Sequence, residues 1–392
     1  MEDLVIPPEF LIILYNVGFL VLFFIWLKKR DIKLLKFFQE LDIRILWAFC
    51  LLLFLIISFI SFNLPTDVDD AVVGGAKAFL NGHNPYMENV VPHTLPNNTD
   101  IKSVYHYFPP DLLTYAFFVF IFGFISSPIL TPTIIMLLAN LIILLPTYIF
   151  FDKILREKLS PKRSFPLFLV LSSPFIVNNS ILMLAFFVIG YFFWNTRQTC
   201  YISKQENKIL GMIFYVLSAS VKYMTGILIL VHFFDDLKVL FQQSTPFRGR
   251  FLFLLPYFLA SLVLASFCLP FGLFEVFKAV FLYQGDPSYR GGVAAMTGPF
   301  LIEFLVFIDA SSLYIPVAAI IFVLAFSYSF YNKSFSLVDK QVFLCFLAMF
   351  ILPFYATELF VIPLFLWFLT MLKNTSHSGS TVALSEKTVS EI

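Results

Sequence analysis

Long uninterrupted apolar runs constrain this chain more than any other feature. Runs such as 45–62, 133–151 and 251–269 come close to the length of about 20 residues that an α-helix needs to cross a bilayer. Only 13% of the residues are charged, whereas about a quarter are charged in a soluble domain. The runs are continuous and do not alternate, which argues against a membrane β-barrel. The sequence therefore predicts an all-α, polytopic transmembrane helical bundle of about eleven apolar segments.

Charge and cysteine content exclude several functional classes. The formal net charge of +1 indicates neither nucleic-acid binding nor electrostatic docking to a membrane. The four cysteines are scattered and have no metal-ligand spacing. The first apolar stretch lacks a preceding basic region, so it does not resemble a cleaved signal peptide. We expect one integral-membrane domain over 1–372, followed by a disordered cytoplasmic tail rich in Ser and Thr over 373–392.

Lysine and arginine positions predict which loops face the cytoplasm. Lys28, Lys29 and Arg30 follow the first apolar segment at 10–27 and should be inside, which places 63–108 on the external face. The Lys/Arg-bearing loops 195–208 and 235–250 should also be inside, so the junctions at Asn178–Ser180 and Lys222 should point to the external half. A second external loop is expected over 271–298.

One basic loop does not fit a simple alternation of crossings. The segment 152–164 holds several Lys and Arg residues and should be inside, yet two crossings from the external loop would place it outside. Either the segment after Pro109-Pro110 dips into the membrane and returns, or this loop breaks the charge rule. The sequence leaves both alternatives open.

The first external loop holds the strongest candidate site. Asp67, Asp69 and Asp70 follow an apolar run directly, and acids at this boundary are expensive to desolvate. One such acid often only solvates the end of a helix, but three acids before two further polar motifs favour a functional site. Residues 71–80 are expected to form a short helix lying on the membrane, ended by Asn81-Gly82.

The two further motifs carry a resemblance. They are Gly82-His83-Asn84-Pro85-Tyr86 and Tyr105-His106-Tyr107-Phe108-Pro109-Pro110. Together with Thr66-Asp67-Val68-Asp69 and the small-residue helix 75–80, their order resembles the GT-C membrane glycosyltransferases. It is most similar to the polyprenyl-phosphate-mannose-dependent mannosyltransferases, which include the first mannosyltransferase of glycosylphosphatidylinositol synthesis and the phosphatidylinositol-mannoside enzymes.

The resemblance implies a function and its partners. The chain would transfer a hexose, with mannose expected first, from a polyprenyl-phosphate donor such as dolichyl phosphate mannose. The acceptor would be a lipid-linked sugar or a glycolipid, and the anomeric centre would be inverted. The protein would be a multi-pass protein of the plasma membrane or an endomembrane, surrounded by membrane lipids, with its active site on the external or lumenal face.

Catalysis of this kind needs a general base, and the acids of the first external loop are the candidates. A carboxylate at the boundary can take the proton of the attacking hydroxyl from the face opposite the leaving group. We expect Asp67 to be the base and Asp69 the second catalytic candidate. Asp69 could equally be an ordinary carboxylate at a helix N-terminus, and Asp70 is expected to cap or solvate that helix.

Substrate binding would fall to cations, aromatic rings and a few polar residues. Cations suit a phosphate leaving group, although Lys222 could instead snorkel to the interface and Arg290 could be a plain loop residue. Tyrosines could stack on the sugar, or belong to an interfacial aromatic belt. The expected residues are Lys222, Arg290 and His106 for the donor phosphate, and Tyr86, Tyr105, Tyr107, Asn178 and Glu358 for the substrates.

Metal dependence and two other functional classes stay open. No cofactor is required by the pattern, but Asp67 and Asp69 could hold Mg²⁺ or Mn²⁺ through oxygen ligands. A membrane transporter or flippase for a lipid or sugar would instead predict inverted repeats and charges near mid-membrane. A subunit without activity would leave the three acids unexplained.

Overall fold

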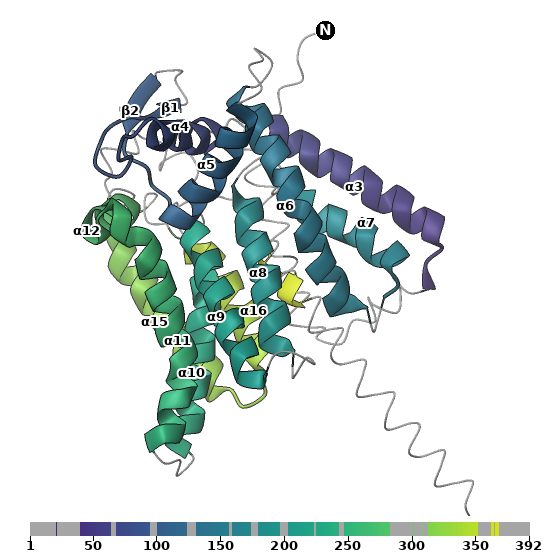
Figure 1. Ribbon diagram of the computed structural model, residues 1–392. Coiled ribbons are helices and arrows are strands. Elements are labelled where there is room, and N and C mark those ends of the chain that lie inside the picture. The colour runs from purple at the N-terminus through teal and green to yellow at the C-terminus, as the bar shows by residue number, and fades with distance from the viewer. Residues whose placement is uncertain are drawn as a thin grey trace, which may run out of the picture. The chain divides into compact units, whose positions relative to one another are not determined.

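The structure, a computed structural model, describes residues 21, 40–63, 68–94, 100–123, 131–156, 159–173, 179–196, 203–222, 225–242, 247–282, 301, 308, 313–351, 362–363 and 365–367. The chain divides into two compact units. One unit is 42–291, and the other combines 1–41 with 292–392. Apart from one two-stranded ribbon, every element of the described ranges is helical (Figure 1). The expected all-α class is confirmed at this level, while about eleven membrane crossings stay a prediction.

The unit 42–291 contains most of the described helices. They are α3 (Ile43–Asn63), α4 (Val68–Leu80), α5 (Pro109–Gly123), α6 (Pro132–Leu155), α7 (Pro161–Ser172), α8 (Ser180–Asn195), α9 (Lys204–Val221), α10 (Gly226–Gln242), α11 (Phe247–Cys268) and α12 (Leu273–Phe277). The local sequence explains where several of these helices begin. Proline opens α5, α6 and α7, where its missing N–H costs nothing. A capping box between Ser203 and Glu206 opens α9.

Residues 63–108, predicted as a polar loop, contain regular structure. The short helix expected over 71–80 is present as α4, and it begins earlier, at Val68. The strands β1 (Val91–Thr94) and β2 (Asp100–Ser103) pair antiparallel, with Val91 opposite Ser103. The second predicted loop, 271–298, also begins with helical turns: η3 (Leu269–Phe271), α12 and the π-helical turn η4 (Lys278–Leu282).

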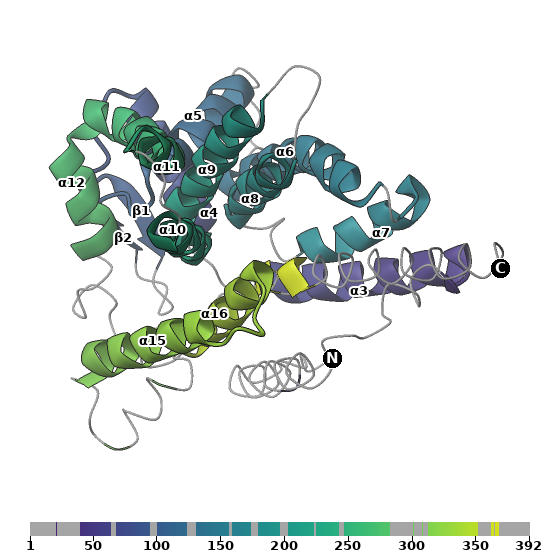
Figure 2. The ribbon, with the colours of Figure 1, turned by 90° about the horizontal axis from the view of Figure 1, so that it is seen from below.

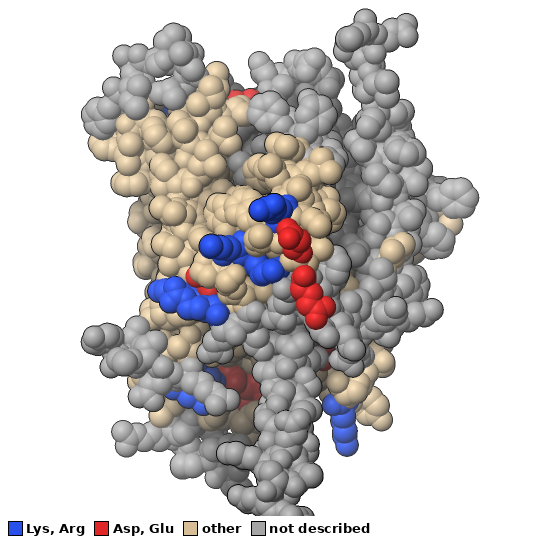
Figure 3. All heavy atoms as spheres, turned by 90° about the vertical axis from the view of Figure 1, so that its right-hand side faces the viewer, with Lys and Arg blue, Asp and Glu red and all other residues tan. Residues whose placement is uncertain are grey.

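Helices α3, α6 and α7 share one end that is rich in basic residues. The indole N–H of Trp47 donates a hydrogen bond of 3.2 Å to the Lys162 carbonyl, which joins the N-terminal parts of α3 and α7. Figure 3 shows basic and acidic side chains gathered on the face of this unit where α3 and α7 lie. The exposed basic residues at this end are Arg44, Lys153, Arg156 and Lys162. Three of them, Lys153, Arg156 and Lys162, belong to the stretch 152–164 that charge patterning places inside.

At the opposite end of α3, helices α4 and α5 pack together with the ribbon (Figure 1). Helix α5 has 15 residues, so it is about 22 Å long and too short to cross about 30 Å of hydrocarbon. Helix α6 packs against α4 and α5, has 24 residues and ends at the basic end. This arrangement agrees with the alternative in which the segment after Pro109-Pro110 dips and returns, leaving α6 as the crossing.

Three helix junctions reach the same end as α4. Asn179, which precedes α8, donates from Nδ2 to Oδ1 of Asp111 at 3.1 Å. Lys222 follows α9, and its Nζ lies 5.0 Å from the centroid of the Tyr107 ring. Phe271 follows α11, and its carbonyl accepts from Asn84 Nδ2 at 3.1 Å. The junctions expected to point to one side thus meet there; which side of a membrane this is stays a prediction.

The bundle behind these junctions is formed by α8, α9, α10 and α11. Figure 2 shows this bundle from below, and α9 contacts each of the other three helices. At its far end, Lys208 Nζ of α9 lies 3.9 Å from Asp236 Oδ1 of α10. The phenol of Tyr257 on α11 donates to the same carboxylate at 2.8 Å. The described residues beside these two predicted loops, Lys208 and Asp236, therefore lie away from the α4 end.

Two helices among the described residues are long and apolar enough to cross a membrane. They are Pro132–Leu155 and Leu252–Phe271. Only 17% of the most apolar window of the second helix is buried inside the protein. Its outward side chains include Phe258 and Leu262, which are 57% and 50% exposed. A core helix of a soluble protein would bury this face, so the exposed apolar surface fits a lipid-facing helix.

In the second unit the described residues form mainly two helices, α15 (Tyr314–Tyr331) and α16 (Leu337–Ile351). An aromatic cluster closes the turn between them, with Phe335 lying 5.6 Å from Phe343 and 6.1 Å from Tyr328 between ring centroids. The Ser336 N–H donates to Asp339 Oδ2 at 3.0 Å at the start of α16. The predicted first segment at 10–27 lies almost wholly outside the described residues. The tail 373–392 lies outside them entirely.

Candidate functional site

The structure describes only part of the predicted site. Asp67, Asn178, Arg290 and Glu358 lie outside the described residues. Asp69 lies in the first turn of α4, where its backbone is described and its side chain is not. The remaining predicted residues, Tyr86, Tyr105, His106, Tyr107 and Lys222, are all described. The tyrosines and Lys222 gather at the α4 end of the unit 42–291.

The Gly82–Tyr86 motif forms the turn that leaves α4. Gly82 adopts a φ of 86°, a left-handed conformation that glycine takes without steric cost and that often ends a helix. Asn84 organises the turn, because its Oδ1 accepts from the Tyr86 N–H at 3.1 Å and its Nδ2 reaches the Phe271 carbonyl. The Asn84 backbone N–H and the His83 ring hydrogen-bond to Glu88 and lower the pKa of that exposed carboxyl. The motif thus ties α4 to the end of α11.

Tyr105 packs directly against glycine in α4. A Cβ atom added at Gly75 would lie 2.4 Å from Tyr105 Cδ2. The tyrosine is fully buried and is held at both ends. Its backbone N–H donates to the Pro85 carbonyl at 2.6 Å, and its phenol donates to Asp111 Oδ2 at 2.5 Å. The small residue in α4 therefore sets where the phenol of Tyr105 can reach.

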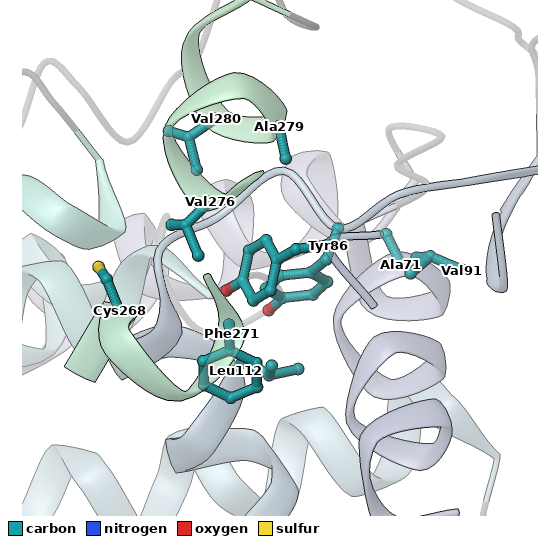
Figure 4. Close-up of a cluster of buried hydrophobic side chains, with 10 residues drawn as sticks. Ala71, Tyr86, Val91, Leu112, Cys268, Phe271, Val276, Ala279 and Val280 are labelled. Atoms are coloured by element: carbon teal, nitrogen blue, oxygen red, sulfur yellow. The ribbon is translucent and has the colours of Figure 1, made fainter. Parts of the chain in front are cut away.

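A hydrophobic cluster locks the two tyrosine motifs in place. The rings of Tyr86 and Tyr105 meet edge to face at 5.7 Å, and Tyr86 meets Phe271 at 5.2 Å. Figure 4 shows the side chains converging from α4, the ribbon, α5 and the segment from α11 to η4. The other buried members are Ala71, Val91, Leu112, Cys268, Val276, Ala279 and Val280. The region around α4 therefore has a core of its own.

This packing changes the role of two predicted sugar-stacking residues. Tyr86 and Tyr105 are 2% and 0% exposed, so their ring faces are covered by protein. The phenol of Tyr86 donates to the Tyr107 carbonyl at 2.7 Å, which fixes the loop that carries Tyr107. Tyr107 itself is half-buried and faces Lys222. Tyr86 and Tyr105 are therefore core residues that hold neighbouring groups in place, and among the three predicted tyrosines Tyr107 is the one that is not fully buried.

Asp111 is a buried carboxylate at the centre of this arrangement. It lies in the first turn of α5, where a negative charge is favoured by the helix dipole. Each of its oxygens has a hydrogen-bond donor: Tyr105 at Oδ2 and Asn179 at Oδ1. It is fully buried, and Lys222 contributes a favourable charge. Burial raises the pKa of Asp111 to about 7, while the two hydrogen bonds and Lys222 oppose that rise.

Asn179, at the start of α8, and Lys222, at the end of α9, connect these two helices to the Asp111 carboxylate. Asn179 is fully buried, and its Oδ1 has no hydrogen-bond partner among the described residues. Lys222 caps the C-terminus of α9, where a cation is favoured by the helix dipole. Its ammonium lies over the Tyr107 ring at a distance typical of a cation–π contact. A half-buried cation beside an aromatic ring and a buried carboxylate suits the binding of a small anionic group.

Metal binding by Asp67 and Asp69 is not decided by the described residues. In those residues there is no group of three or more His, Cys, Asp or Glu side chains that could hold a metal ion. The side chains of Asp67 and Asp69 are not among the described ones. The Mg²⁺ or Mn²⁺ alternative therefore stays a prediction that rests on the sequence.

The sequence reasoning missed Asp111 and Asn179. Asp111 stands directly after Pro109-Pro110 and directly before an apolar run, the same kind of position that singled out Asp67. An acid there signals either a functional or a hydrogen-bonded carboxylate. Asn178 was singled out, but its neighbour Asn179 is the residue that contacts Asp111.

Comparison with known proteins adds no relative. No protein-family model matches this chain, and neither a curated protein nor a solved structure matches it.

Proposed function

We propose that this protein is an integral-membrane glycosyltransferase with a GT-C-like, multi-pass bundle. It would move a hexose, with mannose as the first sugar to test, from a polyprenyl-phosphate donor to a lipid-linked or glycolipid acceptor. The reaction would invert the anomeric centre on the external or lumenal face of the plasma membrane or an endomembrane. Asp67 would be the general base, with Asp69 as the second candidate.

One observation carries the proposal. Segments far apart in the sequence, the turn at Gly82–Tyr86, the loop at Tyr105–Pro110 and the junction at Lys222, meet at the α4 end of one unit. The first two segments belong to the pattern that resembles the mannosyltransferases, and nothing in the apolar pattern alone requires them to meet the Lys222 junction. The half-buried Lys222 supplies the cation that a phosphate leaving group needs.

The chemistry follows from these roles. The acceptor hydroxyl attacks the anomeric carbon while Asp67 takes the hydroxyl proton. The bond between the anomeric carbon and the phosphate oxygen breaks, and polyprenyl phosphate leaves with the bonding electron pair. Lys222 stabilises the negative charge that grows on this phosphate. Helix α4 begins directly after Asp67, so the base would stand at the same end as Lys222 and Tyr107.

The test is sugar transfer by the purified protein in lipid nanodiscs. The protein is incubated with radiolabelled polyprenyl-phosphate mannose and a total membrane lipid extract, and labelled lipid products are separated by thin-layer chromatography. Lys222→Gln should raise the donor KM by about tenfold to a hundredfold, because a charge-assisted contact contributes roughly 1.5–3 kcal/mol. The KM for the acceptor should change much less.

Lys77→Gln is the matched control. Lys77 is an exposed residue of α4 at the same end of the unit, so its loss removes an equal charge without touching Lys222. An unchanged donor KM in Lys222→Gln would place the phosphate elsewhere. If the wild-type protein moves intact donor across the bilayer and forms no labelled product, the protein is a lipid transporter and the transferase proposal fails.

A further inference from the structure

The tyrosine cluster brings two opposite charges, Lys222 and Asp111, to the same place. Lys222 Nζ lies 5.0 Å from the centroid of the Tyr107 ring, the Tyr107 ring meets the Tyr105 ring at 5.6 Å, and the Tyr105 phenol donates to Asp111. Lys222 is half-buried, Asp111 is fully buried, and each lowers the cost of charging the other. A cation that is partly removed from water needs a counter-charge nearby. The pair joins two elements far apart in the chain, the start of α5 and the end of α9.

The groups that face Asp111 identify Lys222 as its counter-charge. Tyr86, Tyr105 and Tyr115 all lie close enough to Asp111 to interact electrostatically, and all three are neutral phenols. The amide of Asn179 is also neutral. Among the described residues that interact with Asp111, Lys222 therefore carries the positive charge.

Both charges are held in place by tyrosine hydroxyls. Tyr105 donates to Asp111, and its ring is pinned against Gly75. Tyr86 donates to the Tyr107 carbonyl, and the Tyr107 ring lies under Lys222. The two supports come from the two motifs of the first predicted external loop. The distance between cation and carboxylate is thus set by the packed core around α4.

We propose that Asp111 is the resident counter-ion of Lys222, and that a phosphodiester donor takes over this role while Asp111 takes up one proton. The step is balanced: the donor brings one negative charge, the proton removes one from Asp111, and the net charge of the cluster does not change. Tyr105 can accept the new hydrogen bond, because a hydroxyl is both donor and acceptor. The identity of the anion rests on the proposed function; the pairing of Asp111 with Lys222 does not.

A pH dependence follows from the exchange. Because the pKa of Asp111 is raised to about 7, the proton is available at neutral pH and becomes scarce above it. Donor KM of the wild type should rise with pH, approaching tenfold per pH unit between about pH 8 and 9. In Asp111→Asn that rise should be lost. Asp111 acts through Lys222, so it is a positioning residue and not a catalytic one.

Asp152→Asn is the matched control for this profile. Asp152 is also a buried acid, 7% exposed, and accepts a hydrogen bond of 2.7 Å from Ser164, but it lies at the basic end of α6. Its variant should keep the wild-type pH dependence of donor KM.

Tyr105→Phe removes the hydrogen bond that stabilises ionised Asp111 and keeps the ring. It should therefore move the onset of the KM rise to higher pH, which a purely structural defect would not do.

A second measurement does not depend on enzymatic activity. The rate at which Lys222 reacts with an amine-specific reagent at pH 8 is read by mass spectrometry of its peptide. A carboxylate counter-ion favours the unreactive ammonium, so Asp111→Asn should raise this rate by at least about threefold. Asp152→Asn should leave the rate unchanged. If Asp111→Asn does not fold, Tyr105→Phe at pH 8 takes its place and should also raise the rate.

The two measurements separate the possible failures. An unchanged Lys222 reactivity in Asp111→Asn overturns the counter-ion, whether or not the protein transfers sugar. A raised reactivity without sugar transfer by the wild type supports the counter-ion and rejects the proposed function. A raised reactivity with a donor KM that does not depend on pH overturns the proton uptake.

Discussion

Replacing Gly75 with alanine tests the packing that positions the candidate site. The new Cβ would lie 2.4 Å from Tyr105 Cδ2 and 2.7 Å from its Cε2, so the ring must retreat by about 1 Å to reach ordinary contact. Tyr105 has no room for this, because it is fully buried and hydrogen-bonded at both ends. The retreat would stretch or break its hydrogen bond with Asp111.

The expected cost can be assembled from three contributions. Overpacking in a core costs about 1–3 kcal/mol. Loss of a hydrogen bond to a carboxylate costs about 1.5–3 kcal/mol. The higher helix propensity of alanine stabilises the helix by about 1 kcal/mol, which offsets part of these two costs. We expect Gly75→Ala to lower the free energy of unfolding by about 1.5–5 kcal/mol, although helix propensity alone predicts that it should stabilise α4.

Unfolding in mixed detergent micelles, followed by tryptophan fluorescence, would measure this change. Gly123→Ala is the control, because a Cβ at Gly123 meets nothing within 4 Å. The double variant Gly75→Ala with Tyr105→Ala should lose less stability than the two single variants added together, since the clash needs both side chains. If Gly75→Ala is as stable as the wild type, Tyr105 does not pack on α4 as described, and its link to Asp111 must be reconsidered.

Two further predictions concern the first external loop. Asp67→Asn should keep the fold, because a carboxylate at the membrane boundary is expected to add little to core packing and such substitutions usually change stability by less than about 0.5 kcal/mol. It should lower sugar transfer about a hundredfold or more. Asp70→Asn should change transfer far less; near-normal transfer by Asp67→Asn together with loss in Asp69→Asn would reassign the base. For topology, Asn98→Cys in a background without the native cysteines should react with an impermeant thiol reagent in intact cells. Labelling only after permeabilisation would reverse the predicted orientation.

The sequence alone located the helices well. The apolar run at 45–62 corresponds to Ile43–Asn63, and the run at 133–151 lies within Pro132–Leu155. Helix formation in an apolar segment depends on nearby residues, because every backbone hydrogen bond is made within four positions. Local signals also marked Asn81-Gly82 as the end of α4, because glycine takes the positive φ that such an end needs.

Only the tertiary structure decided which residues share the candidate site. Asp111 and Asn179 are in contact although 68 positions separate them, and Lys222 joins them from a third element. Tyr86 and Tyr105 changed from candidate sugar contacts to core residues, because burial is set by what packs around a ring. The strands at Val91–Thr94 and Asp100–Ser103 exist through their pairing with each other. Contacts between distant segments depend on the packing of whole helices, which no local pattern encodes.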